Sequence, residues 1–171
     1  YFMGKQTDAL NVNVPDHQAL AHQDWCINHH GAVKGVTGSC HELSYTLNHD
    51  RTGVLIDCGL FQGAETQEHA LPVESDTGSV LDDTIPFDIN HIKALVVTHV
   101  HIDHVGRIPY LLAKGFKGPI YCSEASAKLL PLVLEDAIKI GFTRNRRYVQ
   151  AFVKHVQALI QPLAFNQWQL I

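Results

Sequence analysis

The sequence lacks the marks of several broad classes of protein. Its 171 residues include four cysteines but no CxxC pair, so we expect reduced thiols in a cytoplasmic protein rather than a disulfide framework. No apolar run approaches the length of a membrane span, which argues against a membrane protein. The first residues contain no basic segment followed by an apolar one, so we expect no secretory signal.

Three common catalytic signatures are missing as well. The chain contains no GxSxG-type nucleophile motif, no phosphate-binding P-loop and no paired-glutamate pattern. Positive charge is also scarce, because 13 lysines and arginines face 17 acidic residues and the formal net charge is −4. This balance is not typical of a nucleic-acid-binding protein, although a metal centre would add local positive charge that the count omits.

What is present is enough for one domain. Hydrophobic residues make up 46% of the chain, and the length is sufficient to bury a core. Residues 1–24 are polar, show no periodicity and contain Pro15, so we expect them to form a tail. Residues 25–171 are therefore expected to form the folded domain.

The densest functional signal is the hexapeptide His-Val-His-Ile-Asp-His at residues 99–104. It follows an aliphatic, β-branched run at residues 92–98, which predicts a buried strand. Apolar residues at helical spacing then predict a helix over residues 103–114. The hexapeptide therefore lies on a strand-to-helix loop at the carboxyl end of a strand, where open α/β sheets usually carry their chemistry.

Four residues of this hexapeptide carry side chains that bind metal ions. Because alternate residues of an extended segment point the same way, His99 and His101 can hold one ion between their ring nitrogens. Asp103 and His104 lie where the chain turns into the helix, and they suit a second ion. Imidazole and carboxylate ligands favour zinc and, less exclusively, manganese or iron. We therefore predict a metal site at His99, His101, Asp103 and His104.

This stretch resembles the HxHxDH motif of the metallo-β-lactamase superfamily, and Gly106 and Pro109 extend the match to HxHxDHxGxxP. Upstream, the segment Leu-Ile-Asp-Cys-Gly at residues 55–59 resembles the first motif of that family, an aspartate at the end of a strand. Residues 31–39 and 118–139 resemble one branch of the superfamily, the β-CASP RNA nucleases. The resemblance covers roughly residues 27–140.

The resemblance implies a fold and a site. The fold is an α/β sandwich of the αββα type with mixed sheets and flanking helices, and this chain resembles its amino-terminal half. In that family the HxHxDH residues bind two zinc ions, with manganese as the alternative. Asp103 would orient the attacking water and Asp57 would support the ligands, so these two are the expected catalytic residues. The alternative for Asp57 is an ordinary aspartate at a strand end.

The resemblance also implies a function, the hydrolysis of RNA phosphodiester bonds in RNA processing by an exonuclease or an endonuclease. The later ligands of the family, two histidines and a bridging aspartate, have no match here. We therefore expect an incomplete metal shell and little activity from this chain alone. One alternative is a hydrolase of esters or thioesters that are not nucleic acids. Another is a non-catalytic half-domain that forms a homo-oligomer through an uncovered sheet face.

Hydrophobic periodicity and turn residues predict the remaining elements. Ser123 is expected to cap a helix that Pro131 kinks or breaks. Residues 59–90 are irregular and are expected to form a long surface excursion with a short helix at residues 66–71. Strands are expected at residues 25–33, 40–47, 54–57, 119–122 and 163–171, and helices at residues 124–140 and 149–160.

Three further features each allow two interpretations. The adjacent His29 and His30 should point to opposite sides, one exposed and one packed, and a metal role is the alternative. The glycine-rich segment at residues 34–39 is either a tight turn or a loop whose amides approach a phosphate or the metal site. The basic cluster at residues 143–147 is either a solvated helix start or a contact for an RNA backbone.

Overall fold

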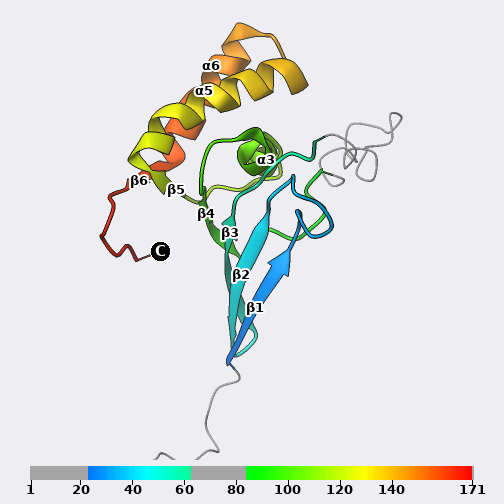
Figure 1. Ribbon diagram of the computed structural model, residues 1–171, viewed down its shortest axis with the longest axis vertical. Coiled ribbons are helices and arrows are strands. Elements are labelled where there is room, and N and C mark those ends of the chain that lie inside the picture. The colour runs from blue at the N-terminus through cyan, green and yellow to red at the C-terminus, as the bar shows by residue number, and fades with distance from the viewer. Residues whose placement is uncertain (1–22, 63–83, 171) are drawn as a thin grey trace, which may run out of the picture.

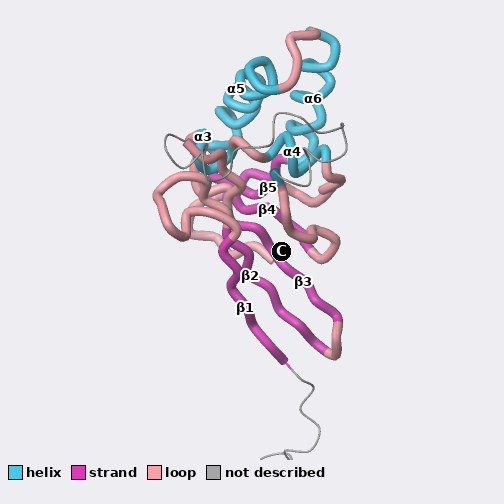
Figure 2. The backbone as a smooth tube through the Cα atoms, turned by 90° about the vertical axis from the view of Figure 1, so that its right-hand side faces the viewer, coloured by secondary structure: helices cyan, strands magenta, loops and turns pink. Residues whose placement is uncertain are grey.

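The computed structural model describes residues 23–62 and 84–170, which form a mixed sheet with helices gathered toward one end (Figure 1 and Figure 2). The strands are β1 (Gln23–His29), β2 (His41–Leu47), β3 (Asp50–Ile56), β4 (Ile92–Val96), β5 (Ile120–Ser123) and β6 (Ile160–Leu163). The helices are α3 (Ile102–Val105), α4 (Ile108–Ala113), α5 (Glu124–Gly141) and α6 (Arg146–Leu159). The expected α/β class, with a mixed sheet and flanking helices, is confirmed.

The sheet is antiparallel on one side and parallel on the other. Its six strands follow the order of the chain, β1-β2-β3-β4-β5-β6. The first three pair antiparallel, whereas β3 to β6 pair in parallel. Because parallel strands end at the same edge of a sheet, the chain leaves β3 and β4 side by side. That edge holds Asp57 and the loop of residues 97–101.

The β2–β3 hairpin turns more tightly than expected. Leu47 pairs with Asp50, so the turn consists of Asn48 and His49, which have φ angles of 49° and 75°. Positive φ at both positions is typical of the hairpin turn whose twist matches that of paired strands. As a result β3 begins at Asp50 rather than at residue 54.

The helix expected after the hexapeptide is interrupted. Its two pieces, α3 and α4, are separated by Gly106 and Arg107. The amide of Arg107 donates to the carbonyl of Cys58 at 2.9 Å, so the backbone leaves the helical path to join the segment that follows β3. A β-carbon at Gly106 would lie 2.7 Å from the side chain of Leu60, which shows how closely these two segments approach.

The carboxyl-terminal helices follow the expectation more closely. Ser123 caps α5 by accepting a hydrogen bond from the amide of Ser126 at 3.2 Å, as predicted. Helix α5 continues through Pro131, so the break considered there is wrong. The last strand was also wrongly placed, because β6 pairs with β5 at Ile160–Leu163 and residues 164–170 form no strand.

The two faces of the sheet differ in how they are covered. Leu55 and Leu95 on paired strands are fully buried, and they join Ile108 and Leu111 of α4 in one hydrophobic core. On the other face Trp25 packs against its cross-strand partner Tyr45 with ring centroids 4.7 Å apart, yet Trp25 is 71% exposed. An open apolar face of this kind was expected.

None of the helices described is long and apolar enough to cross a membrane. The predicted polar tail, apart from residues 23 and 24, and the short helix at residues 66–71 lie outside the described residues.

A buried carboxylate ties the amino-terminal strands to the segment before β4. Glu42 is 2% exposed and accepts hydrogen bonds from His30 at 2.8 Å, from His91 at 2.9 Å and from Arg51 at 2.5 Å. The ring of His30 also stacks on Phe87 at 3.7 Å, whereas His29 is exposed, as the alternation predicted. No local sequence pattern indicates this cluster, because its members are far apart in the chain.

Glu42 makes the stability of the fold sensitive to acid. Burial alone would raise its pKa, but the hydrogen bonds from His91 and His30 and the charge of Arg51 outweigh burial and lower the pKa from 4.5 to about 2. The folded state therefore keeps the carboxylate charged where the unfolded chain would bind a proton. The stabilisation is complete above the unfolded pKa and is lost as the pH falls from about 4.5 toward 2.

We expect Glu42→Gln to remove this acid sensitivity. The lowered pKa of Glu42 contributes roughly 3 kcal/mol of stability in total, at about 1.4 kcal/mol per pKa unit. The wild-type free energy of unfolding should lose part of this contribution between pH 5 and pH 3. Glu42→Gln should be less stable at neutral pH, because His30, His91 and Arg51 lose their partner, and should show a shallower fall. Urea unfolding at both pH values measures this, with the exposed Asp136→Asn as control. An equal fall in Glu42→Gln and wild type would contradict it.

Candidate metal centre

The hexapeptide loop brings its four ligand-type side chains together beside the end of β3. His99 contacts His101 with ring centroids 4.6 Å apart and contacts His104 with centroids 3.9 Å apart. The carboxylate of Asp103 lies 3.7 Å from Nε2 of His104. The four residues predicted from the sequence are thus neighbours in the structure.

The carboxylate of Asp57 holds this loop in place through hydrogen bonds. It is 3% exposed and accepts hydrogen bonds from three separate segments of the chain. The amide and hydroxyl of Thr98 donate at 2.8 Å and 2.9 Å, the hydroxyl of Ser39 donates at 3.2 Å, and Nδ1 of His104 lies 2.7 Å away. Asp57 is therefore more than an ordinary strand-end aspartate, because its carboxylate joins the loops that surround the site.

The contact with Asp57 fixes the chemistry of His104. A carboxylate only accepts hydrogen bonds, so Nδ1 of the ring must carry the proton that it donates. Nε2 of the neutral ring then keeps its lone pair and faces the Asp103 side of the site. Carboxylates that hold one ring nitrogen in this way are the usual support for a metal-binding histidine.

Backbone hydrogen bonds join the same segments. The amide of Cys58 donates to the carbonyl of His104 and the amide of Ser39 donates to the carbonyl of Asp103, both at 2.8 Å. Asp57 itself has a φ of 61°, an uncommon conformation that aspartate tolerates better than most residues. A β-carbon at Gly59 would lie 1.6 Å from the carbonyl oxygen of Asp103, so only glycine permits this approach.

Arg107 is a structural residue that sequence reasoning missed. It is 2% exposed, and its guanidinium donates to the carbonyls of Gly59 at 2.5 Å and Gly38 at 3.4 Å while lying over the ring of Phe61. It thereby clamps the glycine-rich loop to the segment after β3. Thr98 and Ser39 were missed for the same reason, because hydrogen bonds across the fold leave no local pattern in the sequence.

The glycine-rich loop reaches the site through its last residue. Gly38 has a φ of 73°, and a β-carbon there would lie 2.4 Å from the ring of Phe61, so the loop packs tightly at this point. The next residue, Ser39, then donates to Asp57. The loop is therefore a tight turn that also supports the site, and a contact with phosphate stays a prediction.

The donor set can be tested for its fit to a metal. Within residues 23–62 and 84–170, no three histidine, cysteine, aspartate or glutamate side chains converge on a point where an ion would be held. Instead, the ring of His99 contacts the rings of His101 and His104. The donor chemistry fits a divalent metal, since imidazole nitrogens and a carboxylate lie together and one ring is held in the ligand tautomer. The donor types therefore suit a divalent metal, but fewer than three of these side chains converge on one point.

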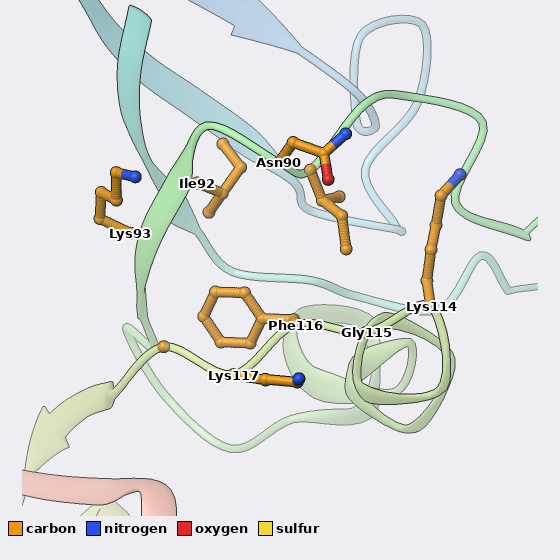
Figure 3. A pocket seen from close by; sticks show the side chains of 9 residues that line it. Asn90, Ile92, Lys93, Lys114, Gly115, Phe116 and Lys117 are labelled. Atoms are coloured by element: carbon orange, nitrogen blue, oxygen red, sulfur yellow. The ribbon is translucent and has the colours of Figure 1, made fainter.

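A cavity near this part of the molecule belongs to a different edge of the sheet. Its volume is about 320 Å³, and it lies at the start of β4, whereas the hexapeptide follows the end of that strand. Figure 3 shows the ring of Phe116 and the side chain of Ile92 lining it, with Lys93, Lys114 and Lys117 around them. It shares no residue with the metal loop, the loop that carries the hexapeptide at residues 99–104, so it is not part of this site.

We expect Asp57→Ala to destabilise the fold more than Asp57→Asn. Alanine removes the acceptor of four donor groups and must adopt the left-handed conformation, so we expect a loss of about 3 kcal/mol or more. Asparagine keeps the shape and one acceptor oxygen, so its loss should be nearer 1 to 2 kcal/mol. Urea unfolding in EDTA measures both without a metal contribution. A negligible loss in Asp57→Ala would show that this carboxylate does not organise the loops.

Comparison with known proteins extends these observations. The chain is 36% identical over 138 residues to "Ribonuclease TTHA0252" of Thermus thermophilus, which covers 81% of the chain and 28% of that protein. It is 32% identical over 148 residues to "Transcription termination factor FttA" of Cenarchaeum symbiosum, covering 86% and 21%. It is 34% identical over 116 residues to "Cleavage and polyadenylation specificity factor subunit 3-II" of Arabidopsis thaliana, covering 67% and 17%.

The chain therefore spans less than a third of the length of these relatives. Their names are consistent with the RNA-nuclease branch that the sequence resembles. Residues 37–166 match the family model described as "Metallo-beta-lactamase superfamily", which is more than half of the chain and includes the hexapeptide, Asp57 and Arg107. This chain belongs to the metallo-β-lactamase superfamily.

Proposed function

We propose that this chain is the metal-binding part of a hydrolase that cleaves RNA phosphodiester bonds. The observation that carries the proposal is the hydrogen bond between Asp57 and Nδ1 of His104, at 2.7 Å, which leaves Nε2 of that ring free to bind a metal. Membership of a superfamily that uses divalent metals supports the site. The choice of RNA is supported by the names of the relatives rather than by the net charge of −4.

We assign four residues as metal ligands. His99 and His101 would hold one ion, and Asp103 and His104 a second. Zinc fits this donor set best, and manganese is the alternative. Each ion would receive two ligands from these residues, fewer than the three that catalytic zinc sites usually have. The affinity of this chain for zinc should therefore be modest.

The residues around the ligands have distinct tasks in this proposal. Divalent ions at such a site supply positive charge beside the scissile phosphate and lower the pKa of the attacking water. Asp103 would orient that water through its carboxylate. Asp57 holds His104 in place through Nδ1, and Arg107 keeps the surrounding loops together. Asp57 therefore acts on the reaction by positioning another residue.

We place residues 25–171 as the amino-terminal portion of the metallo-β-lactamase domain. The relatives are more than three times as long as the aligned segment, which leaves room in such proteins for further ligands. We accordingly expect little hydrolysis by this chain alone and metal-dependent hydrolysis by a longer protein that contains it.

Two other expectations stay predictions. The cytoplasmic location rests on cysteine usage alone. A homo-oligomer through the open face of the sheet is supported by the exposure of Trp25 and Ile27, at 71% and 64%.

The proposal predicts a specific loss of metal. His101→Ala should weaken zinc binding by this chain at least about tenfold, because it removes a ligand, and equilibrium dialysis with elemental analysis measures it. His155→Ala is the matched control, since His155 is an exposed histidine on α6 outside the site. In a longer protein, EDTA should inhibit the hydrolysis of a labelled RNA, and His101→Ala should abolish that hydrolysis.

Three results would contradict this proposal. Zinc binding that is unchanged in His101→Ala, or equally weakened in His155→Ala, would remove the metal assignment. Preferential hydrolysis of a thioester or lactone by the longer protein would replace RNA with a different substrate class.

A further inference from the structure

A second cavity is lined by residues of α5, of α6 and of the turn between them. These two helices lie at the end of the molecule opposite the β1–β3 strands (Figure 1 and Figure 2). Its volume is about 500 Å³. The residues that line it come from the end of α5, the connecting turn and the start of α6, and they are Glu135, Lys139, Arg144, Arg146, Val149 and Gln150. None of them belongs to the metal loop.

The charges around this cavity are predominantly positive. Glu135 and Lys139 neutralise each other in an ion pair at 2.7 Å on α5. Arg144 and Arg146 are exposed, and within the part of the chain that the structure describes neither forms an ion pair or a side-chain hydrogen bond. Two guanidinium groups are therefore available to a ligand, in a chain whose overall charge is −4.

The position of these arginines is unfavourable for the helix itself. Arg146 and Arg147 occupy the first turn of α6, which contains no acidic residue. The amino-terminal end of a helix carries partial positive charge, so cations there reduce helix stability. Asn145 already caps the helix by accepting from the amide of Arg147 at 3.0 Å. The arginines thus do not stabilise this end, and a bound anion would relieve their repulsion.

We propose that Arg144 and Arg146, which line this cavity, bind phosphates of a single-stranded RNA backbone at a site separate from the metal loop. The choice of RNA as the anion rests on the proposed function, whereas the need for a polyanion rests on the charges. Guanidinium groups suit phosphate because their planar donors match two phosphate oxygens at once. Such a contact would hold a strand on the protein without reading its sequence.

Fluorescence anisotropy with a labelled oligouridine, in EDTA, tests this site on the full 171-residue chain. The double variant Arg144→Gln/Arg146→Gln should bind about tenfold more weakly near 0.1 M salt. Its plot of log K against log salt concentration should become less steep by about 1.4, or 0.7 for each lost phosphate contact. The matched control is Lys93→Gln/Lys117→Gln, which also removes two exposed cations but from the cavity in Figure 3. Its affinity should change less than threefold.

A thermal melt separates binding from folding. The arginine variant should melt no lower than wild type, because it removes cations from the positive end of α6. Equal weakening by the two double variants would overturn the proposal, since it would mean general attraction to any basic surface. No binding by wild type, or equal binding of polyglutamate, would overturn it too.

Failure of this test is distinguishable from failure of the proposed function. The anisotropy measurement is made in EDTA and scores binding alone, whereas the hydrolase proposal depends on zinc binding at His101. A chain that binds zinc through His101 but shows no RNA contact at the arginines would retain the first proposal and lose the second.

Discussion

The buried carboxylate of Asp57 is the interaction on which the site depends. It lies where β3 ends, and a buried charge is costly unless donors surround it. Its donors come from Ser39, Thr98 and His104, so satisfying one carboxylate fixes three loops at once. The parallel pairing of β3 with β4 makes this possible, because it brings Asp57 beside the segment that begins at Thr98.

The same arrangement links the fold to its chemistry. The histidine that donates to Asp57 through Nδ1 is left with Nε2 for a metal, so the support of the loop also selects the ligand tautomer. Gly59 allows the segment after β3 to approach the hexapeptide loop closely, and Arg107 clamps the glycine-rich loop to them. These residues therefore explain how the sheet and its loops bring the side chains of the hexapeptide together.

The sequence predicted what local pattern controls and missed what long-range contacts control. Hydrophobic runs and the spacing of the hexapeptide are local, so β4, the cap at Ser123 and the grouping of the candidate metal ligands were predictable. The break between α3 and α4 was not, because it depends on a hydrogen bond from Arg107 to Cys58. The Glu42 cluster was missed for the same reason, since its members belong to distant segments.

The tautomer of His104 is the most direct test of this account, and long-range ¹H–¹⁵N NMR correlation of the histidine rings in EDTA measures it. Wild type should show His104 protonated at Nδ1, with Nε2 carrying the lone pair. Asp57→Asn should lose this preference, because its amide can also act as a donor. A His104 ring protonated at Nε2 in wild type would contradict the claim that Asp57 prepares this residue to bind metal.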